Sequence, residues 1–154
     1  MLLSQDMEEL LELFEKRRVK YALVGGYAVN FYGYSRATQD LDLLVYPSIP
    51  NAQRIMAALD EFGFGEAGIP RQYFEQKGSA IHLGVEPNRI DLLTSLKSVD
   101  NDRIFQNSIR GSLGSVTVNI IAIDDLIEVK HRSERLRDRA DAEELRRLER
   151  HSQP

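Results

Sequence analysis

The sequence predicts an α+β domain in which helices flank a mixed β-sheet and the C-terminal part is helical. Short apolar runs that suit buried strands are interspersed with longer amphipathic segments that suit helices. The two kinds of segment do not alternate in the regular strand–helix–strand order of a wholly parallel sheet. The 154 residues contain no internal repeat or linker, which predicts a single domain over 1–154.

The N-terminal half is predicted to contain three helices and two strands. The helices cover residues 4–18, 26–33 and 51–62, and the strands cover residues 21–25 and 40–45. Ser4 is the expected N-cap of the first helix, and Asn51 is the expected cap of the third. The second helix begins at a glycine pair, and Pro47 and Pro50 end the second strand.

The C-terminal half is predicted to contain a hairpin, a short helix, one further strand and a charged helical tail. The hairpin strands cover 80–85 and 89–93 with a turn at 86–88, the helix covers 100–108, and the next strand covers 115–121. Residues 63–77 contain several glycines and have no clear pattern. From Ile123 onward the pattern is helical, and the tail over 132–150, with many acid–base pairs, is predicted to be one helix or two broken near Asp138.

Composition excludes several classes of protein. The chain has no cysteine, which rules out disulfides, zinc–thiolate sites and thiol nucleophiles. The formal net charge of −4 argues against a general nucleic-acid binder, although local patches matter more than the total. The acidic start is unlike a signal peptide and no apolar run is long enough to span a bilayer. We therefore expect a cytoplasmic protein without a membrane partner.

Two carboxylates in one strand provide the strongest chemical signal. Asp40 and Asp42 are separated by one residue, so in a strand they point to the same face while Leu41 and Leu43 point into the core. Like charges this close repel each other unless a cation lies between them. The pair is thus a candidate divalent-metal site, and the upstream Gly25-Gly26 offers a bare backbone that can approach phosphates.

A third acid, Asp91, lies in the apolar run Arg89-Ile-Asp-Leu-Leu93, where a charge is costly unless it is paired or bound to metal. A strand carrying Asp91 beside the Asp40/Asp42 strand would bring three carboxylates together. Such a cluster can hold the metal ions that phosphoryl transfer uses, and Asp91 could serve as general base for an acceptor hydroxyl. The alternative is a structural ion pair of Asp91 with Arg89 or Arg36.

The order of these parts resembles the DNA polymerase-beta-like nucleotidyltransferase superfamily. The resemblance rests on Gly25-Gly26, the loop Arg36-Ala-Thr38, Asp40-x-Asp42 and the later strand aspartate. The tail is most similar to the AbiEii-type nucleotidyltransferase family, many of whose members are toxin components. The tail residues that carry this likeness are Ile123-Asp-Asp-Leu-Ile127, Lys130, Arg135, Arg137-Asp138 and Asp141.

The resemblance implies a polymerase-beta-like fold and transfer of a nucleoside monophosphate from an NTP to a hydroxyl of RNA (tRNA among them), protein or a small molecule. The implied site residues divide into three sets. Magnesium, or manganese, would be held by Asp40, Asp42 and Asp91, with Lys130 in the catalytic group. The nucleotide would be bound by Gly25, Gly26, Tyr27, Arg36, Thr38, Asp138 and Asp141. Arg36 and Lys130 would meet phosphate oxygens, and Asp138 or Asp141 would hold Lys130 or the substrate.

Several alternatives remain open on the sequence alone. Tyr27 stands where many superfamily members have serine or threonine, which favours a non-catalytic nucleotide-binding module or toxin–antitoxin partner with the same fold. Lys130 could belong to a solvent-facing side of its helix, and Asp138 and Asp141 could pair with arginines of their own helix. His82 is expected to be an ordinary strand histidine, although its alternation could place it on the face of the carboxylates. An antitoxin partner and a homodimer through the charged tail are further interpretations.

Overall fold

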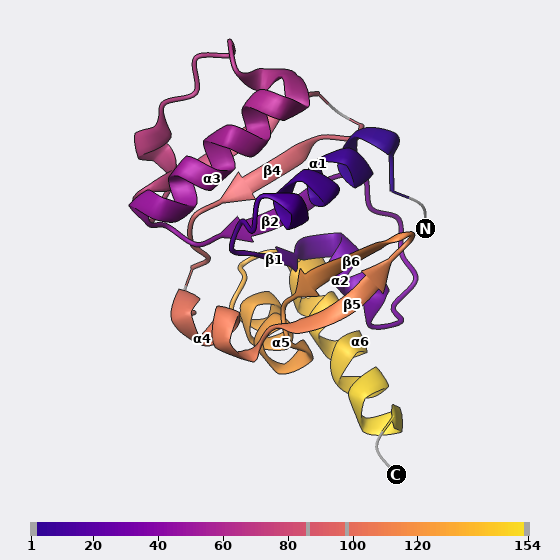
Figure 1. The fold of residues 1–154 in the computed structure, drawn as a ribbon. Helices are drawn as coiled ribbons and strands as arrows, with labels where there is room; N and C mark the ends of the chain where they lie inside the picture. The colour runs from indigo at the N-terminus through magenta and orange to yellow at the C-terminus, as the bar shows by residue number, and fades with distance from the viewer. Residues whose placement is uncertain (1–2, 86, 98, 153–154) are drawn as a thin grey trace.

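A computed structural model of the chain describes residues 3–85, 87–97 and 99–152, and it contains one six-stranded mixed sheet with the strand order β3-β4-β2-β1-β6-β5 (Figure 1). The strands are β1 (Tyr21–Val24), β2 (Leu41–Val45), β3 (Ala80–Leu83), β4 (Ile90–Leu93), β5 (Ile109–Leu113) and β6 (Val116–Ile120). β2 runs parallel to β4 and β1 parallel to β6, whereas the other three neighbouring pairs are antiparallel. The predicted α+β class is confirmed.

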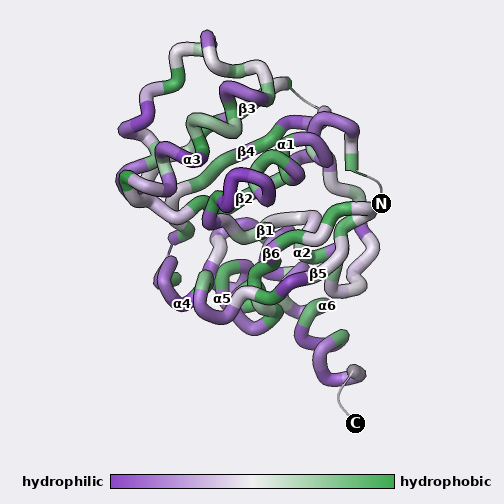
Figure 2. Tube along the Cα trace, in the orientation of Figure 1, coloured by the Kyte–Doolittle hydropathy of each residue, from purple (hydrophilic) through white to green (hydrophobic). Residues whose placement is uncertain are grey.

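Helices cover both sides of this sheet (Figure 1). They are α1 (Gln5–Lys16), α2 (Gly25–Phe31), α3 (Ile49–Leu59), α4 (Asn101–Asn107), α5 (Ile123–His131) and α6 (Leu136–Ser152). α1 packs against α3, while α2 contacts α5 and α5 packs along α6. The apolar residues gather in the strands and on the inner sides of these helices, whereas the far end of α6 is hydrophilic (Figure 2).

The α1 helix shows how the local sequence specifies its element. The Ser4 hydroxyl accepts a hydrogen bond from the Met7 N–H at 3.2 Å, as the predicted N-cap requires. Its apolar stripe is completely buried at Leu10, Leu11 and Phe14. The burial of such a stripe, rather than helix propensity, supplies most of the stability of a helix this short.

Three predictions of local structure need correction. The cap of α3 is Ser48, whose hydroxyl accepts from the Asn51 N–H, and Pro50 lies in the first turn. Asn51 is instead buried, and its side chain bonds the backbone of Lys20 and Tyr46. Strand β5 was not predicted, because Ile109–Leu113 is an edge strand with few apolar residues.

The remaining segments differ less from expectation. Residues 63–77, for which no pattern was evident, include part of a π-helical turn at Asp60–Phe64 and a 3₁₀ turn at Arg71–Phe74. The charged tail forms one helix, α6, which begins at Leu136 and is not broken at Asp138. The turn predicted at 86–88 includes Glu86, which lies outside the described residues. Within the part of the chain that the structure describes, none of the helices has the length and apolar character needed to cross a membrane.

Candidate functional site

The three predicted acids lie near the ends at which the neighbouring inner strands β2 and β4 begin. In the parallel pair of β2 and β4, Asp42 and Asp91 occupy directly opposite positions, and parallel neighbours in register point to the same face. Asp40 immediately precedes β2. The tertiary structure therefore brings together carboxylates that are about fifty residues apart in the chain.

This arrangement perturbs the ionisation of Asp42. Burial, together with the neighbouring carboxylates of Asp91 and Asp40, raises the pKa of Asp42 to about 7, and only Lys130 acts in the opposite direction. A carboxyl group with this pKa is about half ionised at neutral pH. A cation placed among these acids would remove the repulsion and complete the ionisation of Asp42.

Asp91 has a different environment, because two basic side chains hold it. Arg89 Nε donates to Asp91 Oδ1 at 2.8 Å and Arg89 Nη2 donates to Oδ2 at 3.1 Å. His82 lies opposite Asp91 on β3, and its Nδ1 is 2.6 Å from Asp91 Oδ1. Burial alone would raise the pKa of Asp91, but the hydrogen bonds and charges of Arg89 and His82 outweigh it and lower that pKa below its ordinary value. The predicted alternative of an Arg89–Asp91 ion pair is thus present, and His82 does share the face of the carboxylates.

The acids offer a partial fit to a divalent cation. Asp40 Oδ1 is buried and has no hydrogen-bond partner among the described residues, and the charge of Asp42 is uncompensated. These two carboxylates suit Mg²⁺, which prefers oxygen ligands and takes only one or two carboxylates at many sites. Among the described residues, however, no group of three or more acids or histidines is arranged to hold a metal ion. The assignment of Asp91 as a metal ligand therefore stays a prediction.

The glycine pair is required by close packing against the site. A Cβ at Gly25 would lie 2.2 Å from Asp42 Oδ2, and a Cβ at Gly26 would lie 2.3 Å from Thr38 Oγ1. Gly25 also has a φ of +69°, a conformation that disfavours side chains. The pair therefore lets α2 start directly beside Asp42 and the loop that carries Thr38.

A network of ion pairs forms the opposite wall of the site. Lys130 on α5 contacts Asp138 Oδ1 at 3.1 Å and Asp141 Oδ2 at 3.4 Å, both on α6. Asp141 is 1% exposed and also accepts a hydrogen bond at 2.9 Å from Arg36 Nη2. The hydrogen bond between Ser133 and Asp138 further links α6 to the preceding turn. Together these contacts bind α5, α6 and the loop over 34–40 into one unit.

Two open interpretations of the tail are wrong as a result. Lys130 does not lie on a solvent-facing side, because it is 8% exposed and points between α5 and α6. Asp138 and Asp141 do not pair chiefly with arginines of their own helix, since their partners come from α5, the preceding turn and the loop. Burial is the largest single effect and raises the pKa of Asp138, but Ser133, Lys130 and Arg135 together outweigh it and lower that pKa.

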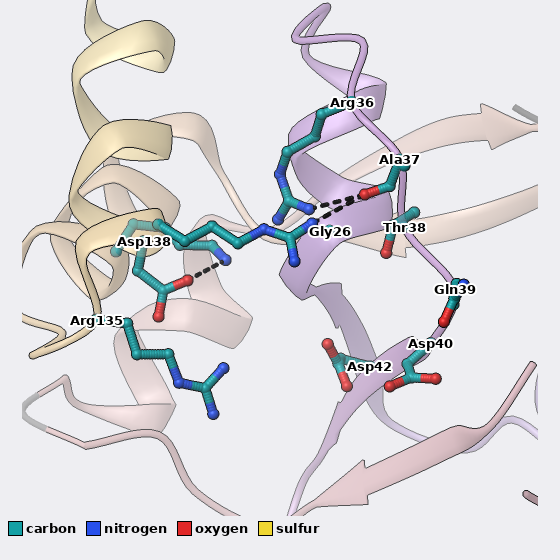
Figure 3. A pocket seen from close by; sticks show the side chains of 11 residues that line it. Gly26, Arg36, Ala37, Thr38, Gln39, Asp40, Asp42, Arg135 and Asp138 are labelled. Carbon is teal, nitrogen blue, oxygen red and sulfur yellow. Dashed lines mark hydrogen bonds and ion pairs between the residues drawn. The ribbon is translucent and has the colours of Figure 1, made fainter. Parts of the chain in front are cut away.

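The acids and the ion-pair network line opposite sides of a pocket of about 480 Å³ (Figure 3). Seven predicted site residues line it: Gly26, Arg36, Thr38, Asp40, Asp42, Lys130 and Asp138. Four do not: Gly25, Tyr27, Asp91 and Asp141. Of these, Gly25, Asp91 and Asp141 support lining residues, whereas Tyr27 is buried in the core, where a base cannot stack on it without rearrangement.

Four further residues line the pocket without having been predicted as site residues: Ala37, Gln39, Arg135 and Arg137. Arg137 Nη2 donates to the Ala37 carbonyl at 3.0 Å, while Arg135 points into the open space (Figure 3). The sequence did contain a signal for Arg135 and Arg137 as site residues, because both follow Lys130 within seven positions. Four basic side chains thus surround one space, and a phosphate-bearing ligand is the chemistry that they suit.

Comparison with known proteins supports the fold. Neither a known family profile nor a characterised relative matches this sequence. In three dimensions the chain is similar to the crystal structure of the lincosamide antibiotic adenylyltransferase LnuA bound to lincomycin, with a TM-score of 0.59 and 16% sequence identity. The similarity covers 96% of this chain and 99% of that one. The fold of the chain is therefore similar to that of LnuA, whereas the AbiEii-type assignment stays a prediction.

Proposed function

We propose that this protein is a divalent-metal-dependent nucleotidyltransferase that moves a nucleoside monophosphate from an NTP to a hydroxyl acceptor. One observation carries the proposal: the pocket has the carboxylates of Asp40 and Asp42 on one side and basic side chains on the other. An NTP–metal complex has this same polarity, since its cation seeks carboxylates and its phosphates seek arginine and lysine.

In the proposed reaction the oxygen of the acceptor hydroxyl attacks the α-phosphorus of the NTP. The bond from the α-phosphorus to the bridging oxygen breaks, pyrophosphate leaves, and the hydroxyl proton passes to a base. Arg36, Lys130, Arg135 and Arg137 compensate the charge of the triphosphate. Gly26 lines the pocket at the start of α2 without a side chain of its own, so phosphates could approach its backbone.

The acids have distinct proposed roles. Asp40 and Asp42 would hold Mg²⁺ or Mn²⁺, which when bound neutralises phosphate charge and orients the reacting oxygens. Asp91 is assigned to the proton of the acceptor or to completion of the metal site. In both roles the contacts of Asp91 with Arg89 and His82 keep it ionised. The ion pairs with Asp138 and Asp141 fix the side chain of Lys130 in a position from which it could contact phosphate.

The structural neighbour supports this assignment and suggests substrates. LnuA is an adenylyltransferase for lincosamide antibiotics, so ATP is the first NTP to test and a small hydroxylated molecule is one acceptor class. RNA and protein hydroxyls are the other classes that the sequence resemblance implies. An antitoxin partner, a homodimer and a cytoplasmic location remain predictions from the sequence.

The direct test is incubation of the protein with each α-labelled NTP, Mg²⁺ or Mn²⁺, and three acceptor pools: total RNA, total protein and hydroxylated small molecules. Transfer of label that is abolished by a chelator and by Asp42→Asn would support the proposal. An Asp60→Asn variant is the matched control, because Asp60 is an exposed acid at the end of α3, away from the pocket. Absence of both NTP binding and transfer would refute it.

A second candidate is a non-catalytic nucleotide-binding module or toxin–antitoxin partner with the same fold. The observation that favours it is the engagement of both Asp91 oxygens by Arg89, whose Nη2 also lies 3.7 Å from Asp40 Oδ2, so that part of the acidic charge is balanced without a cation. Calorimetry with each NTP and Mg²⁺ separates the two candidates when it is combined with the transfer assay. Binding without turnover on any acceptor would favour the module.

A further inference from the structure

Four arginines follow one side of the C-terminal helix. Arg135 immediately precedes α6, and its carbonyl accepts the Arg139 N–H at 3.2 Å, so it begins the helical hydrogen-bond pattern. Arg139, Arg146 and Arg150 follow at spacings of seven and four residues. Residues separated by four, seven and four positions lie on the same side of an α-helix. We call these four residues the arginine row.

The arginine row is not used by the fold. All four side chains are exposed, and none forms an ion pair or a side-chain hydrogen bond with another described residue. Glu143 lies beside the row and forms no ion pair within the described part of the chain, and Asp138, three residues after Arg135, has its pKa lowered in part by the charge of Arg135. Most other arginines of the described chain do have acidic partners, as Arg147 has Glu144 and Arg110 has Glu15.

The position of the row connects it to the candidate site. Arg135 lines the pocket and points into it (Figure 3), while α6 continues away from the body of the protein toward the C-terminus (Figure 1). At 1.5 Å per residue, the fifteen residues from Arg135 to Arg150 span about 22 Å. The apolar side of α6 is occupied separately, because Ala142 and Leu145 are completely buried in the protein.

We propose that the arginine row binds the phosphate backbone of a polynucleotide and leads its terminal hydroxyl into the pocket. The inference rests on the proposed function and names its acceptor class. A small acceptor would fit within the pocket and could not contact guanidinium groups about 15–20 Å away along the helix. A polynucleotide carries a repeating charge over this distance, and unpaired arginines in an otherwise acidic chain are complementary to it.

A membrane surface fits the helix less well. Helices that lie on membranes present a broad apolar side next to their basic side. On α6, Leu136 is the one large apolar residue that is mainly exposed within the described residues, at 78%. The row is therefore better suited to the phosphates of a polynucleotide in solution. Binding to an acidic protein or to a vesicle is one of the outcomes that the test distinguishes.

The test compares two triple variants that remove the same charge. Arg139→Ala/Arg146→Ala/Arg150→Ala removes the outer row and leaves the pocket residue Arg135 in place. Arg54→Ala/Arg71→Ala/Arg147→Ala removes three exposed arginines outside the row, one of which, Arg147, lies on α6 itself; Arg71 and Arg147 pair with Glu75 and Glu144. Alanine favours helix, so thermal melts followed by circular dichroism should show both variants folded.

Binding of a fluorescein-labelled single-stranded 20-nucleotide RNA, and of the DNA of the same sequence, is measured by anisotropy at about 50–200 mM KCl without NTP. Each phosphate contact contributes about −0.7 to the slope of log K against log salt for single strands. Loss of three contacts should therefore reduce the slope by about 2 and weaken binding at about 50 mM by at least tenfold. The control variant should bind like the wild type, and the RNA and DNA arms identify which polynucleotide is preferred.

Three results would overturn the inference. The first is that the wild type binds neither RNA nor DNA. The second is that both triple variants lose the same amount of polynucleotide affinity. The third is that the wild type binds only polyglutamate or anionic phosphatidylglycerol vesicles. Calorimetric titration of the same samples with ATP and Mg²⁺ keeps the two proposals apart. NTP binding without polynucleotide binding overturns the arginine row alone. Polynucleotide binding that depends on the row, without NTP binding, supports the row and counts against the proposed function.

Discussion

Asp42→Asn should make the metal-free protein more stable while abolishing transfer. Burial and two neighbouring carboxylates raise the pKa of Asp42 to about 7 from an ordinary value of 3.8. At 1.36 kcal/mol for each tenfold change in proton affinity, ionising Asp42 in the folded state costs roughly 4 kcal/mol. Asparagine has nearly the same shape and no charge. We therefore expect a gain of about 2–4 kcal/mol in the free energy of unfolding at pH 8.

The stabilising effect of Asp42→Asn should depend on pH, because it arises from the ionisation of Asp42. Between pH 3.8 and about 7 the folded protein holds a proton on Asp42 that the unfolded chain has released, so wild-type stability falls as the pH rises through this interval. Asparagine mimics the protonated form. The two proteins should thus be similarly stable near pH 4, and the variant should gain its advantage progressively up to about pH 7.

The assay is urea unfolding and thermal melting of both proteins in a chelator at pH 4, 6 and 8. For a chain of this length, about 2–4 kcal/mol corresponds to a rise in Tm of roughly 5–10 °C. Added Mg²⁺ should stabilise the wild type and reduce the stability difference between it and Asp42→Asn, since the cation compensates the charge of Asp42. Asp60→Asn should show neither effect. A variant that is no more stable than the wild type at pH 8 would refute the reasoning that the charge of Asp42 is uncompensated.

Three further substitutions test the other parts of the site. Gly26→Ala places a Cβ 2.3 Å from Thr38 Oγ1, so it should lower the free energy of unfolding by about 1–3 kcal/mol and also weaken NTP binding. The second substitution Thr38→Gly should restore part of both losses. Unchanged NTP binding in calorimetry would contradict the close approach of phosphates to Gly26. Asp141→Asn leaves Arg36 and Lys130 without their shared buried carboxylate. Urea unfolding should show a loss of about 3 kcal/mol in the free energy of unfolding. The more exposed Asp138→Asn should cost about 1 kcal/mol in the same measurement. Lys130→Met should weaken binding of a non-hydrolysable NTP by at least about tenfold, while circular dichroism stays unchanged, and equal affinity would remove Lys130 from the phosphate site.

Much of the site was predictable from short-range pattern. Alternation along a strand places Asp40 and Asp42 on one face, and a glycine pair between a strand and a helix indicates close backbone packing. The packing partners were not predictable. Gly25 is needed beside Asp42 and Gly26 beside Thr38, contacts that depend on how the 34–40 loop returns to the sheet.

The roles of the basic residues depended on contacts between distant segments. His82 holds Asp91 because β3 and β4 place the two residues opposite each other, which no single strand encodes, whereas the contact with Arg89 is local and was predicted as an alternative. Asp138 and Asp141 look like surface acids of an arginine-rich helix. They turn inward because α5 packs along α6 and leaves Lys130 in need of buried partners.

The sequence by itself determined the α+β class, the helix at Gln5–Lys16, the acidic strand and the glycine turn, since each follows from periodicity or backbone freedom within a few residues. Only the tertiary structure decided which charges meet. Electrostatic energy depends on distance and burial, and both are set by the order of strands in the sheet and the packing of helices on it. For that reason an Asp91 of lowered pKa, an Asp42 of raised pKa and an arginine row without ion pairs are found in a single chain whose charges, seen along the sequence, look alike.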